Sequence, residues 1–563
     1  MVLQEISWAV GMTTEERRME MAGFKGSRPF LKICRDRSLI LFLALLFFAS
    51  AGYASTEEKP QRGGTLIFAV GGEPPTYDGH RENTFGLIHP ISPHYSLLLK
   101  FDEDHYPKVI GDLAESWTVS KDQRTYTFKI RKAVKFHDGS ILTSKDVKAT
   151  YEKIIFPPQG VISPRFAFYS CVEKVETPDD STVVFHLKWA SSSFLASLAS
   201  PWNYIYKAEI LAKNMRWYER NVMGTGPFKF VEHVAGSHWV GKRNEDYFQK
   251  GLPYLDGYRA LFIQDTSARV SAIRAGRVHV EFRGFPPTQR DDLVRTMGDQ
   301  VRVQENSMTT CLLLIFNSEK KPFDDPRVRR ALTLALDRWE GSKALSKMSI
   351  GKWVGGLLRP GSEFALTEEE LVQIPGYSRD IQASRKEARR LLREAGVPEG
   401  FSFDLYNRPT AMPYEIDAIW VADQWRQIGL NVKQKVQEYG AMLNLYRTGN
   451  YGAGVNNISD YMDEPDLQFT WSLSADKSSH NYGRYKDPIL DDLYQRQNRT
   501  LDPAERRNLC KQYQQRVLGE MAYCFPTFWW HRIIPHSAKL KGLKLLPSHF
   551  LNQDLSHLWL SKE

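Results

Sequence analysis

The alternation of strand and helix patterns between residues 401 and 457 constrains the fold more than any other feature of this sequence. Two strand-like stretches, Phe401 to Tyr406 and Leu430 to Val436, flank apolar residues at helical spacing that end at Gly429: Ile419, Ala422, Trp425 and Ile428. A strand–helix–strand crossover of this length makes its two strands parallel. A further helix near residues 441–446 leads to another strand at Tyr451 to Asn457. The pattern therefore predicts an α/β fold with a parallel sheet.

A helix with clear ends precedes this unit. Ser384 and Glu387 form a capping-box pattern at its expected start, and Gly396 with Pro398 marks its end. We therefore expect a helix from about residue 384 to residue 395.

A second unit, between Trp117 and Leu187, is predicted to be mostly antiparallel. "RTYTFKIR" (124–131) and "STVVFHL" (181–187) alternate apolar and polar residues, as half-buried strands do. Between them, Gly139 is suited to the positive φ of a turn, and Thr143 with Asp146 forms a capping box that opens a helix.

Four carboxylates fall within the eight residues Ser459 to Asp466, "SDYMDEPD", directly after the last predicted strand. Ligands of open α/β sheets lie beyond the carboxyl ends of the strands, so this acidic loop is a candidate wall of a binding cleft. The spacing does not match an EF-hand, although a calcium site completed by backbone oxygens is an alternative. An acid/base pair would need carboxylates placed across a substrate, which neighbours on one loop do not show. A solvated loop turned by Glu464 and Pro465 is the simplest interpretation for some of the four.

Composition excludes several classes of function. Of the 563 residues, 42% are hydrophobic and 25% are charged, as in a folded globular protein. The formal charge of +9 is spread along the chain without a Lys/Arg block, which gives no support for nucleic-acid binding. Four cysteines follow residue 54, too few and too scattered for a disulfide scaffold or a CxxC metal site. HExxH and GxSxG motifs do not occur.

The first 54 residues read as a signal peptide with an upstream extension. An apolar run of eleven residues, Leu39 to Ala49, follows Lys32, Arg35 and Arg37. This run is too short for a membrane span, which needs about 20 residues, and suits a secretory signal core of about 7 to 15. Gly52 and Ala54 offer a cleavage site before Ser55, and an uncleaved anchor is the alternative. Cys34 precedes the apolar core, so no lipoprotein signal is seen. Cleavage would remove seven Lys/Arg and five Asp/Glu and lower the charge to +7.

Several stretches stand in the order and spacing of one known family. They are "LAESW" (113–117), "YTFKIR" (126–131), "VKFHDGS" (134–140), "TSKDV" (143–147), "GTGPFKF" (224–230), "RNEDYF" (243–248), "NSEKKPFDDPRVRRALTLALDR" (317–338) and "RYKDPILDDL" (484–493). In these stretches the chain resembles extracytoplasmic solute-binding protein family 5, the dipeptide-, oligopeptide- and nickel-binding proteins of ABC importers. The resemblance covers nearly the whole chain after residue 54.

The resemblance implies a two-lobe periplasmic-binding-protein fold of the dipeptide-binding type (type II), with an additional small α+β subdomain in the N-terminal lobe. Lobe I would comprise residues 55–95, 205–305 and 526–563, its subdomain residues 96–204, and lobe II residues 306–525. Such a protein is periplasmic and monomeric, uses no cofactor and is not an enzyme. It would bind a peptide or other small amine-bearing solute between its lobes and deliver it to ABC transporter permease subunits.

The resemblance also implies where the solute binds. In peptide-binding members an Asp on the matching loop, usually four residues before a Pro, pairs with the substrate ammonium group. Asp460 lies five residues before Pro465, so either Asp460 or Asp463 would take this role. The Trp that peptide-binding members often carry three residues before that Asp is Asn457 here, which puts peptide specificity in question. Other wall candidates by family position are Tyr461, Tyr77, Glu82, Asn317 and Trp529.

Two other functions remain open. One is a secreted hydrolase of peptides or glycosides that uses two of Asp460, Asp463 and Glu82 as its carboxylates. The other is a binding protein that has lost transport and serves as a sensor or chaperone.

Overall fold

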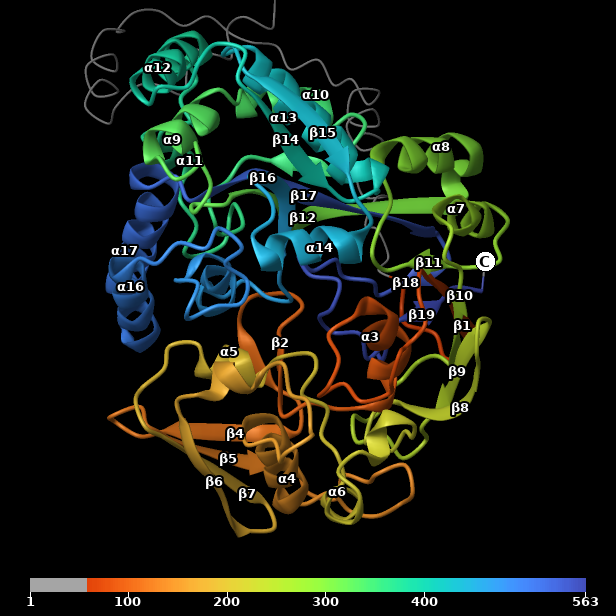
Figure 1. Ribbon diagram of the computed structural model, residues 1–563. Helices are drawn as coiled ribbons and strands as arrows, with labels where there is room; N and C mark the ends of the chain where they lie inside the picture. The colour runs from red at the N-terminus through yellow and green to blue at the C-terminus, as the bar shows by residue number, and fades with distance from the viewer. Residues whose placement is uncertain (1–57, 563) are drawn as a thin grey trace, which may run out of the picture. The chain divides into compact units, whose positions relative to one another are not determined.

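The computed structural model describes residues 58–562, and the compact unit that carries the described fold is residues 60–563 (Figure 1). The sheets and helices described below all belong to this unit. The predicted signal peptide and upstream extension, residues 1–54, lie outside the described residues. Within the described part of the chain, no helix is long and apolar enough to cross a membrane.

A five-stranded sheet has the order β11-β1-β10-β9-β8. Its strands are β1 (Thr65–Val70), β8 (Phe228–Val234), β9 (His238–Arg243), β10 (Gly257–Phe262) and β11 (Val280–Glu281). β1 is parallel to both β10 and β11, whereas β9 and β8 continue the sheet antiparallel. The carboxyl ends of three strands therefore meet at one edge, and the chain beyond them leads to α3 (Phe85–Ile91), α7 (Thr266–Arg274) and α8 (Pro287–Met297).

A six-stranded sheet has the order β13-β17-β12-β16-β14-β15. Its strands are β12 (Val301–Phe316), β13 (Gly351–Trp353), β14 (Ser402–Asn407), β15 (Asn431–Val436), β16 (Ala453–Ser459) and β17 (Cys524–Ser537). β14 is parallel to β15 and to β16, which confirms the predicted crossover. The connecting helices are α13 (Ile416–Arg426) and α14 (Tyr439–Thr448). Gly429 has the positive φ of +88° that the turn after α13 requires.

The long strands β12 and β17 pair antiparallel from Val301↔Ser537 to Ile315↔Cys524, with register shifts between Ser307 and Leu313. The predicted lobe boundaries, residues 306 and 526, fall inside these strands. One ribbon therefore runs from the five-stranded side of the molecule into the six-stranded sheet (Figure 1). A register shift locally interrupts the ladder of hydrogen bonds, so this stretch is suited to bending.

A small antiparallel sheet has the order β4-β5-β7-β6 and packs against α4 (Ser144–Ile155). Its strands are β4 (Ala114–Val119), β5 (Thr125–Ile130), β6 (Val172–Asp179) and β7 (Thr182–Leu187). Gly139 has a φ of +89°, and Thr143 with Asp146 forms the complete capping box of α4. The predictions for the turn and the helix start are therefore confirmed. A separate pair, β2 (Leu99–Phe101) and β3 (Val109–Gly111), lies nearby in the chain.

The predicted start of the helix near residue 384 is wrong. Helix α12 (Ile381–Glu394) begins earlier, because Asp380 is the N-cap and its carboxylate accepts from Ala383 N–H. The Ser384 hydroxyl instead donates back to the Asp380 carbonyl. The predicted end is confirmed, since Gly396 has a φ of +73°.

The remaining helices and strands complete the unit. They are α5 (Phe194–Leu198), α6 (Ala208–Lys213), α9 (Pro326–Leu334), α10 (Arg338–Leu345), α11 (Glu368–Leu371), α15 (Pro465–Gln468), α16 (Pro488–Arg499), α17 (Pro503–Gln514), β18 (Leu540–Lys541) and β19 (Trp559–Leu560). Each of the three larger sheets has its own buried core. Met462 and Leu467 come shortly after strand β16 of the six-stranded sheet, but their side chains pack in the core of the small antiparallel sheet. The acidic loop therefore joins two parts of the fold.

Candidate functional site

The acidic loop runs from the carboxyl end of β16 to α15, and it is buried. The relative exposures of Asp460, Glu464 and Asp466 are 8%, 5% and 5%, and the Asp463 side chain is 4% exposed. The interpretation of these residues as a solvated loop is therefore wrong, because Met462 and Leu467 hold the loop inside a hydrophobic core. Buried carboxylates require charge partners or hydrogen-bond donors.

Asp463 is fully engaged by Arg359. The Arg359 Nε lies 2.9 and 3.0 Å from the two carboxylate oxygens, and Nη2 lies 2.7 Å from Oδ2. The Asp463 backbone N–H donates to the Tyr106 hydroxyl at 2.8 Å, and Tyr106 comes from the loop between β2 and β3. This ion pair already compensates the charge of Asp463 inside the protein, so Asp463 holds the loop in place.

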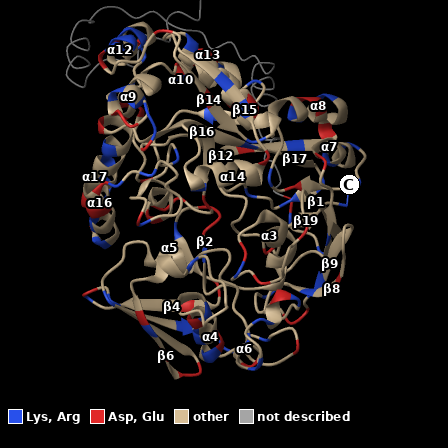
Figure 2. Ribbon diagram, in the orientation of Figure 1, with Lys and Arg blue, Asp and Glu red and all other residues tan. Residues whose placement is uncertain are grey.

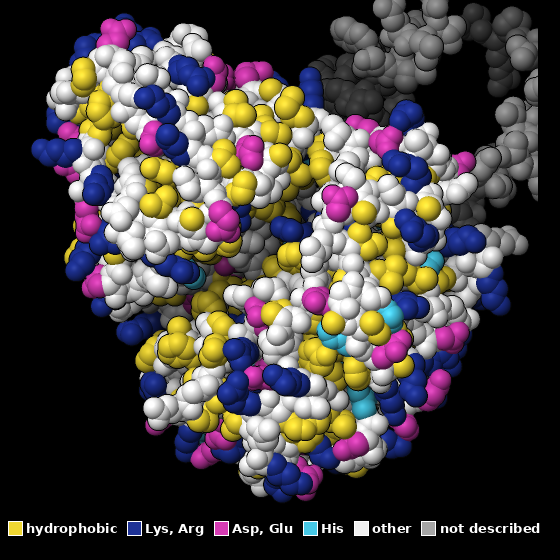
Figure 3. Space-filling view, turned by 45° about the vertical axis from the view of Figure 1, so that its right-hand side comes forward, with side chains coloured by type: hydrophobic (Ala, Val, Ile, Leu, Met, Phe, Trp, Pro, Cys, Tyr) yellow, Lys and Arg dark blue, Asp and Glu magenta, His cyan; other side chains and the backbone are white. Residues whose placement is uncertain are grey.

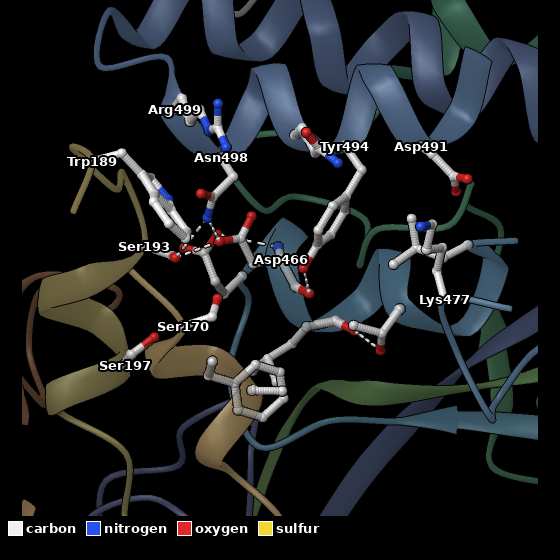
Figure 4. Close-up of a pocket in the computed structure, with 17 residues that line it drawn as sticks. Ser170, Trp189, Ser193, Ser197, Asp466, Lys477, Asp491, Tyr494, Asn498 and Arg499 are labelled. Carbon is white, nitrogen blue, oxygen red and sulfur yellow. Dashed lines mark hydrogen bonds between the residues drawn. The ribbon is translucent and has the colours of Figure 1, made fainter. Parts of the chain in front are cut away.

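Glu464 and Asp466 are also satisfied by the protein itself. Glu464 pairs with Arg506 of α17, which is also 3.7 Å from Asp466. The Asp466 carboxylate accepts from Ser193, Gln497 and Asn498. Ser193 precedes α5, whereas Asn498 lies on α16, so Asp466 ties two segments together that are far apart in sequence (Figure 4).

A cavity of about 380 Å³ lies beside Asp466 (Figure 4). Trp189 forms one wall, with the Arg499 guanidinium 5.1 Å from its ring centre, and Tyr494 forms another. The hydroxyl of Tyr494 donates to the Asp466 carbonyl at 3.1 Å. The polar groups around Asp466 are therefore hydrogen-bonded to one another, and they stabilise the contact between helix α16 and the segment before α5.

Asp460 differs from the other three acids. Its Oδ2 is buried and has no hydrogen-bond partner, and no ion pair to it exists in residues 58–562. Burial raises its pKa to about 7, although a hydrogen bond from Trp471 lowers this pKa and the nearby Asp463 raises it. A buried carboxylate without a cation is unfavourable unless it is protonated or a cation arrives from outside.

Tyr461 anchors the loop on its other side. Its ring packs against the core of the small antiparallel sheet and also against that of the five-stranded sheet. Burial raises the pKa of its hydroxyl to about 12, even though the neighbouring Arg165 and a hydrogen bond with Ser200 lower this pKa. Asp460, Tyr461 and Asp463 thus lie on a loop where these two cores meet.

The hydrogen bonds of the other four predicted residues go to groups outside the acidic loop. Asn317 follows the end of β12 that pairs with Ala453, about six residues, or roughly 20 Å, along the ladder from Ser459. Its amide donates to the Gly449 carbonyl at 2.9 Å. Trp529 is fully buried in β17, and its indole N–H donates to the Gly356 carbonyl at 3.0 Å. Both side chains support the six-stranded sheet.

Tyr77 and Glu82 lie in the loop after β1. The Tyr77 hydroxyl is 2.7 Å from His233 Nδ1, and its ring meets Trp239 edge-on at 4.9 Å. The side-chain Oε1 of Glu82 accepts a hydrogen bond from the adjacent Asn83 N–H, and the backbone carbonyl of Glu82 accepts one from the Arg165 guanidinium. These contacts give each residue a role within the five-stranded part of the fold.

The sequence analysis missed an arginine at the same sheet edge as Asp460. Arg408 follows β14, which is parallel to β16, so both strands present their carboxyl ends there. Arg408 Nη2 donates to Asn457 Oδ1 at 2.9 Å, and the guanidinium stacks between Tyr414 and Tyr439 at 4.1 and 4.2 Å from the ring centres. Its Nε is buried without a partner. Its position directly after a predicted parallel strand was the signal that could have identified it.

A second missed arginine belongs to the five-stranded sheet. Arg283 follows β11, reaches solvent, and lines a cavity of about 390 Å³ together with Tyr414. The cavity has walls from both large sheets, since β11 belongs to one and residues 410–414 follow β14 of the other. Figure 3 shows a hollow on one face of the molecule, with hydrophobic and Lys/Arg side chains in it. Figure 2 shows the positions of the charged residues along the ribbon between the sheets.

No group of three or more His, Cys, Asp or Glu side chains in the described part of the chain is placed to hold a metal ion. The calcium alternative for the acidic loop is therefore not supported. Within residues 58–562 the site instead offers a buried carboxylate without an ion-pair partner and two guanidinium groups without carboxylate partners, which suits recognition of charged solute groups.

The chain matches the model of the bacterial extracellular solute-binding proteins, family 5, over residues 108–480. It is 26% identical over 560 residues to the oligopeptide-binding protein AppA of Bacillus subtilis, covering 93% of this chain and 98% of that one. It is 28% identical to the dipeptide-binding protein of Escherichia coli, covering 86% and 92% of the two chains. Among solved structures it resembles AgaA of A. tumefaciens in complex with agropinic acid, with a TM-score of 0.72 and 27% identity over 89% of this chain and 99% of that one.

The fold is that of a type II periplasmic binding protein, with an α/β architecture of two large sheets and an additional small sheet. The chain belongs to family 5 of the bacterial extracellular solute-binding proteins.

Proposed function

We propose that this protein captures a small solute carrying both an ammonium and a carboxylate group, such as a short peptide, and delivers it to the permease of an ABC importer. The solute would bind between lobe I (55–95, 205–305, 526–563) and lobe II (306–525), with residues 96–204 as the subdomain of lobe I. The protein would act in the periplasm as a monomer, without a cofactor and without chemical turnover.

One observation carries the proposal: Asp460 is the only carboxylate of the acidic loop with neither an ion pair nor a partner for its buried Oδ2 within residues 58–562, although Trp471 hydrogen-bonds the group. An ammonium group would remove the cost of burying this charge and would add a charge-assisted hydrogen bond. This favours Asp460 over Asp463 as the amine clamp, because Arg359 already occupies Asp463.

Arg408 supplies the complementary end of the site. Its guanidinium is held in orientation by Asn457 and two tyrosine rings, yet it faces no carboxylate of the described protein. A guanidinium oriented in this way can bind a carboxylate with two parallel hydrogen bonds. A zwitterionic solute would therefore complete the electrostatics at the carboxyl ends of β14 and β16.

The relatives named as oligopeptide- and dipeptide-binding proteins support this class of solute, because peptides carry both an ammonium and a carboxylate group. The alternative of a hydrolase receives less support. Of its three proposed carboxylates, Asp463 is held by Arg359 and Glu82 bonds to the adjacent backbone amide, which leaves Asp460 alone.

The proposal is tested by titrating dipeptides, free amino acids and opines with isothermal titration calorimetry, each beside its N-acetylated and C-amidated form. We expect the free form to bind and each blocked form to bind about 10- to 100-fold more weakly, because each loses a charge-assisted hydrogen bond of about 1.5–3 kcal/mol. Asp460→Asn should remove the preference for the free amine. Asp476→Asn, an exposed acid of the same lobe, is the matched control and should retain it. Equal binding of free and acetylated solutes by the unaltered protein would refute the amine clamp.

A further inference from the structure

The cavity at Arg283 contains cationic side chains and no carboxylate. Its volume is about 390 Å³, and its lining includes Arg269, Arg283, Gln289, Tyr414, Trp530 and His531 but no Asp or Glu. Cavities that hold an excess of one charge attract ligand groups of the opposite charge. The cavity is therefore suited to an anionic group.

Arg283 is the residue of this lining that remains available. No hydrogen bond or ion pair of its guanidinium exists within residues 58–562, and the guanidinium lies over the Phe85 ring, at 4.7 Å from the ring centre. Arg269, by contrast, donates to the carbonyls of Ile263 and Gln264. Its role is to hold the chain after β10.

The backbone around Arg283 is fixed. The Glu281 carboxylate accepts from the backbone N–H groups of Arg283 and Gly284, at 3.1 and 2.8 Å. Glu281 is 2% exposed and does not line the cavity, although its charge lies close enough to raise the pKa of Arg283. The turn therefore sets the direction in which Arg283 leaves β11.

The charges near Arg283 do not balance. Desolvation by the surrounding protein is the main effect on Arg283, and it lowers the pKa of the guanidinium. Glu281 and Tyr414 raise this pKa, whereas the positive charges of Arg269 and Arg408 lower it. Tyr414 lies near both guanidinium groups, since both Arg408 and Arg283 lower the pKa of its hydroxyl against the effect of burial. Two partner-free guanidinium groups thus approach one tyrosine from opposite sheets, and a single carboxylate could neutralise only one of them.

We infer that the solute carries a second anionic group, in addition to the carboxylate at Arg408, and that Arg283 binds this group. This inference rests on the proposed function and narrows it to amine-bearing solutes with at least two negative charges, of which acidic peptides are the simplest. An arginine fork matches carboxylate and phosphate groups alike, so either group would satisfy the site. Because Arg283 and Arg408 come from the two large sheets, such a solute bridges the lobes.

The test compares solutes that differ in one charged group. Ala-Glu is titrated beside Ala-Gln, and Ala-phosphoserine beside Ala-Ser, by calorimetry at low and physiological salt. We expect the unaltered protein to bind the anionic member of at least one pair about 10- to 100-fold more tightly. A preference in the first pair alone assigns a carboxylate, and a preference in the second alone assigns a phosphate.

Variants then locate the second anionic site. Arg283→Gln should reduce the preference for the anionic member to less than about threefold, and Arg283→Lys, which keeps the charge but loses the fork, should give an intermediate ratio. Arg277→Gln, an exposed arginine nearby that does not line the cavity, is the matched control. Melting temperatures of the variants without solute show that each has folded.

The outcomes separate this inference from the proposed function. If both members of each pair bind equally well, or if Arg283→Gln keeps the full preference, the second anionic site is refuted while the amine clamp stands. If no free solute binds better than its N-acetylated form, the proposed function fails and this inference fails with it.

Discussion

Replacing Arg506 with methionine is expected to lower the free energy of unfolding by about 3–5 kcal/mol, because the variant leaves a buried carboxylate without its cation. Arg506 and Glu464 have side chains that are 6% and 7% exposed, and Asp466 lies 3.7 Å from the same guanidinium. The guanidinium also packs 4.7 Å from the centre of the Phe364 ring. Urea unfolding monitored by tryptophan fluorescence measures the loss.

The control is Arg496→Met on the neighbouring helix α16. Arg496 pairs with Asp492 at 3.5 Å, but both side chains are more than half exposed, so we expect a loss below about 0.5 kcal/mol.

In the Arg506→Met background, Glu464→Gln should recover a large part of the stability, because it removes the unpaired charge. Burial raises the pKa of Glu464 and Arg506 lowers it, so the loss should be smaller at pH 5, where Glu464 without Arg506 takes up a proton. An equal loss in Arg506→Met and Arg496→Met would show that the buried pair does not hold the acidic loop.

Asp460→Asn is expected to have opposite effects on stability and on binding. The pKa of Asp460 is raised to about 7 in the folded protein, mainly by burial, from an ordinary value of 3.8. The contribution of the protonated Asp460 side chain to the free energy of unfolding is therefore fully present below about pH 4. This contribution is lost as the pH rises through about 7 and the side chain loses its proton. At pH 8 the Asn variant, which carries no charge there, should be more stable than the unaltered protein without solute, by on the order of 2–4 kcal/mol.

Unfolding curves at pH 4 and pH 8 test this prediction. At pH 4 Asp460 is protonated in the folded protein, and the two proteins should have nearly the same stability. Asp417 is a useful internal reference, because burial also raises its pKa to about 7 while Thr527 donates to it at 3.0 Å. Asp417 should give both proteins a shared decrease of stability with pH. A variant that is less stable than the unaltered protein at pH 8 would mean that a cation inside the protein compensates the charge of Asp460.

The same titration predicts how binding depends on pH. An amine-bearing solute requires Asp460 in its charged form and its own amine protonated, so its affinity should rise from pH 5.5 to about pH 7 and fall again above about pH 8, where the α-amino group of a peptide loses its proton. Calorimetry in buffers with different heats of protonation should show that protons are released on binding below pH 7. The affinity of Asp460→Asn should be lower and should not change where that of the unaltered protein rises.

Local patterns allowed the elements and their order to be predicted. The period of the apolar residues gave the parallel crossover from β14 to β15, and the capping box at Thr143 gave the start of α4, because these signals depend on neighbours along the chain. The start of α12 was missed by three residues because Asp380, Ser384 and Glu387 form competing caps. Only the observed backbone geometry distinguishes them.

The sequence alone determined that four acidic residues follow a predicted parallel strand. It therefore identified the acidic loop as a candidate binding site, because ligands of α/β folds lie beyond the carboxyl ends of such strands. Only the tertiary structure decided what each acid does, because their partners are far away in the chain: Arg359 for Asp463, Arg506 for Glu464, and Ser193 with Asn498 for Asp466. The free charge of Asp460 and the two unpaired arginines likewise follow from the packing of segments that are far apart in the sequence. Electrostatic free energy depends on distance and burial in space, which spacing along the chain does not encode.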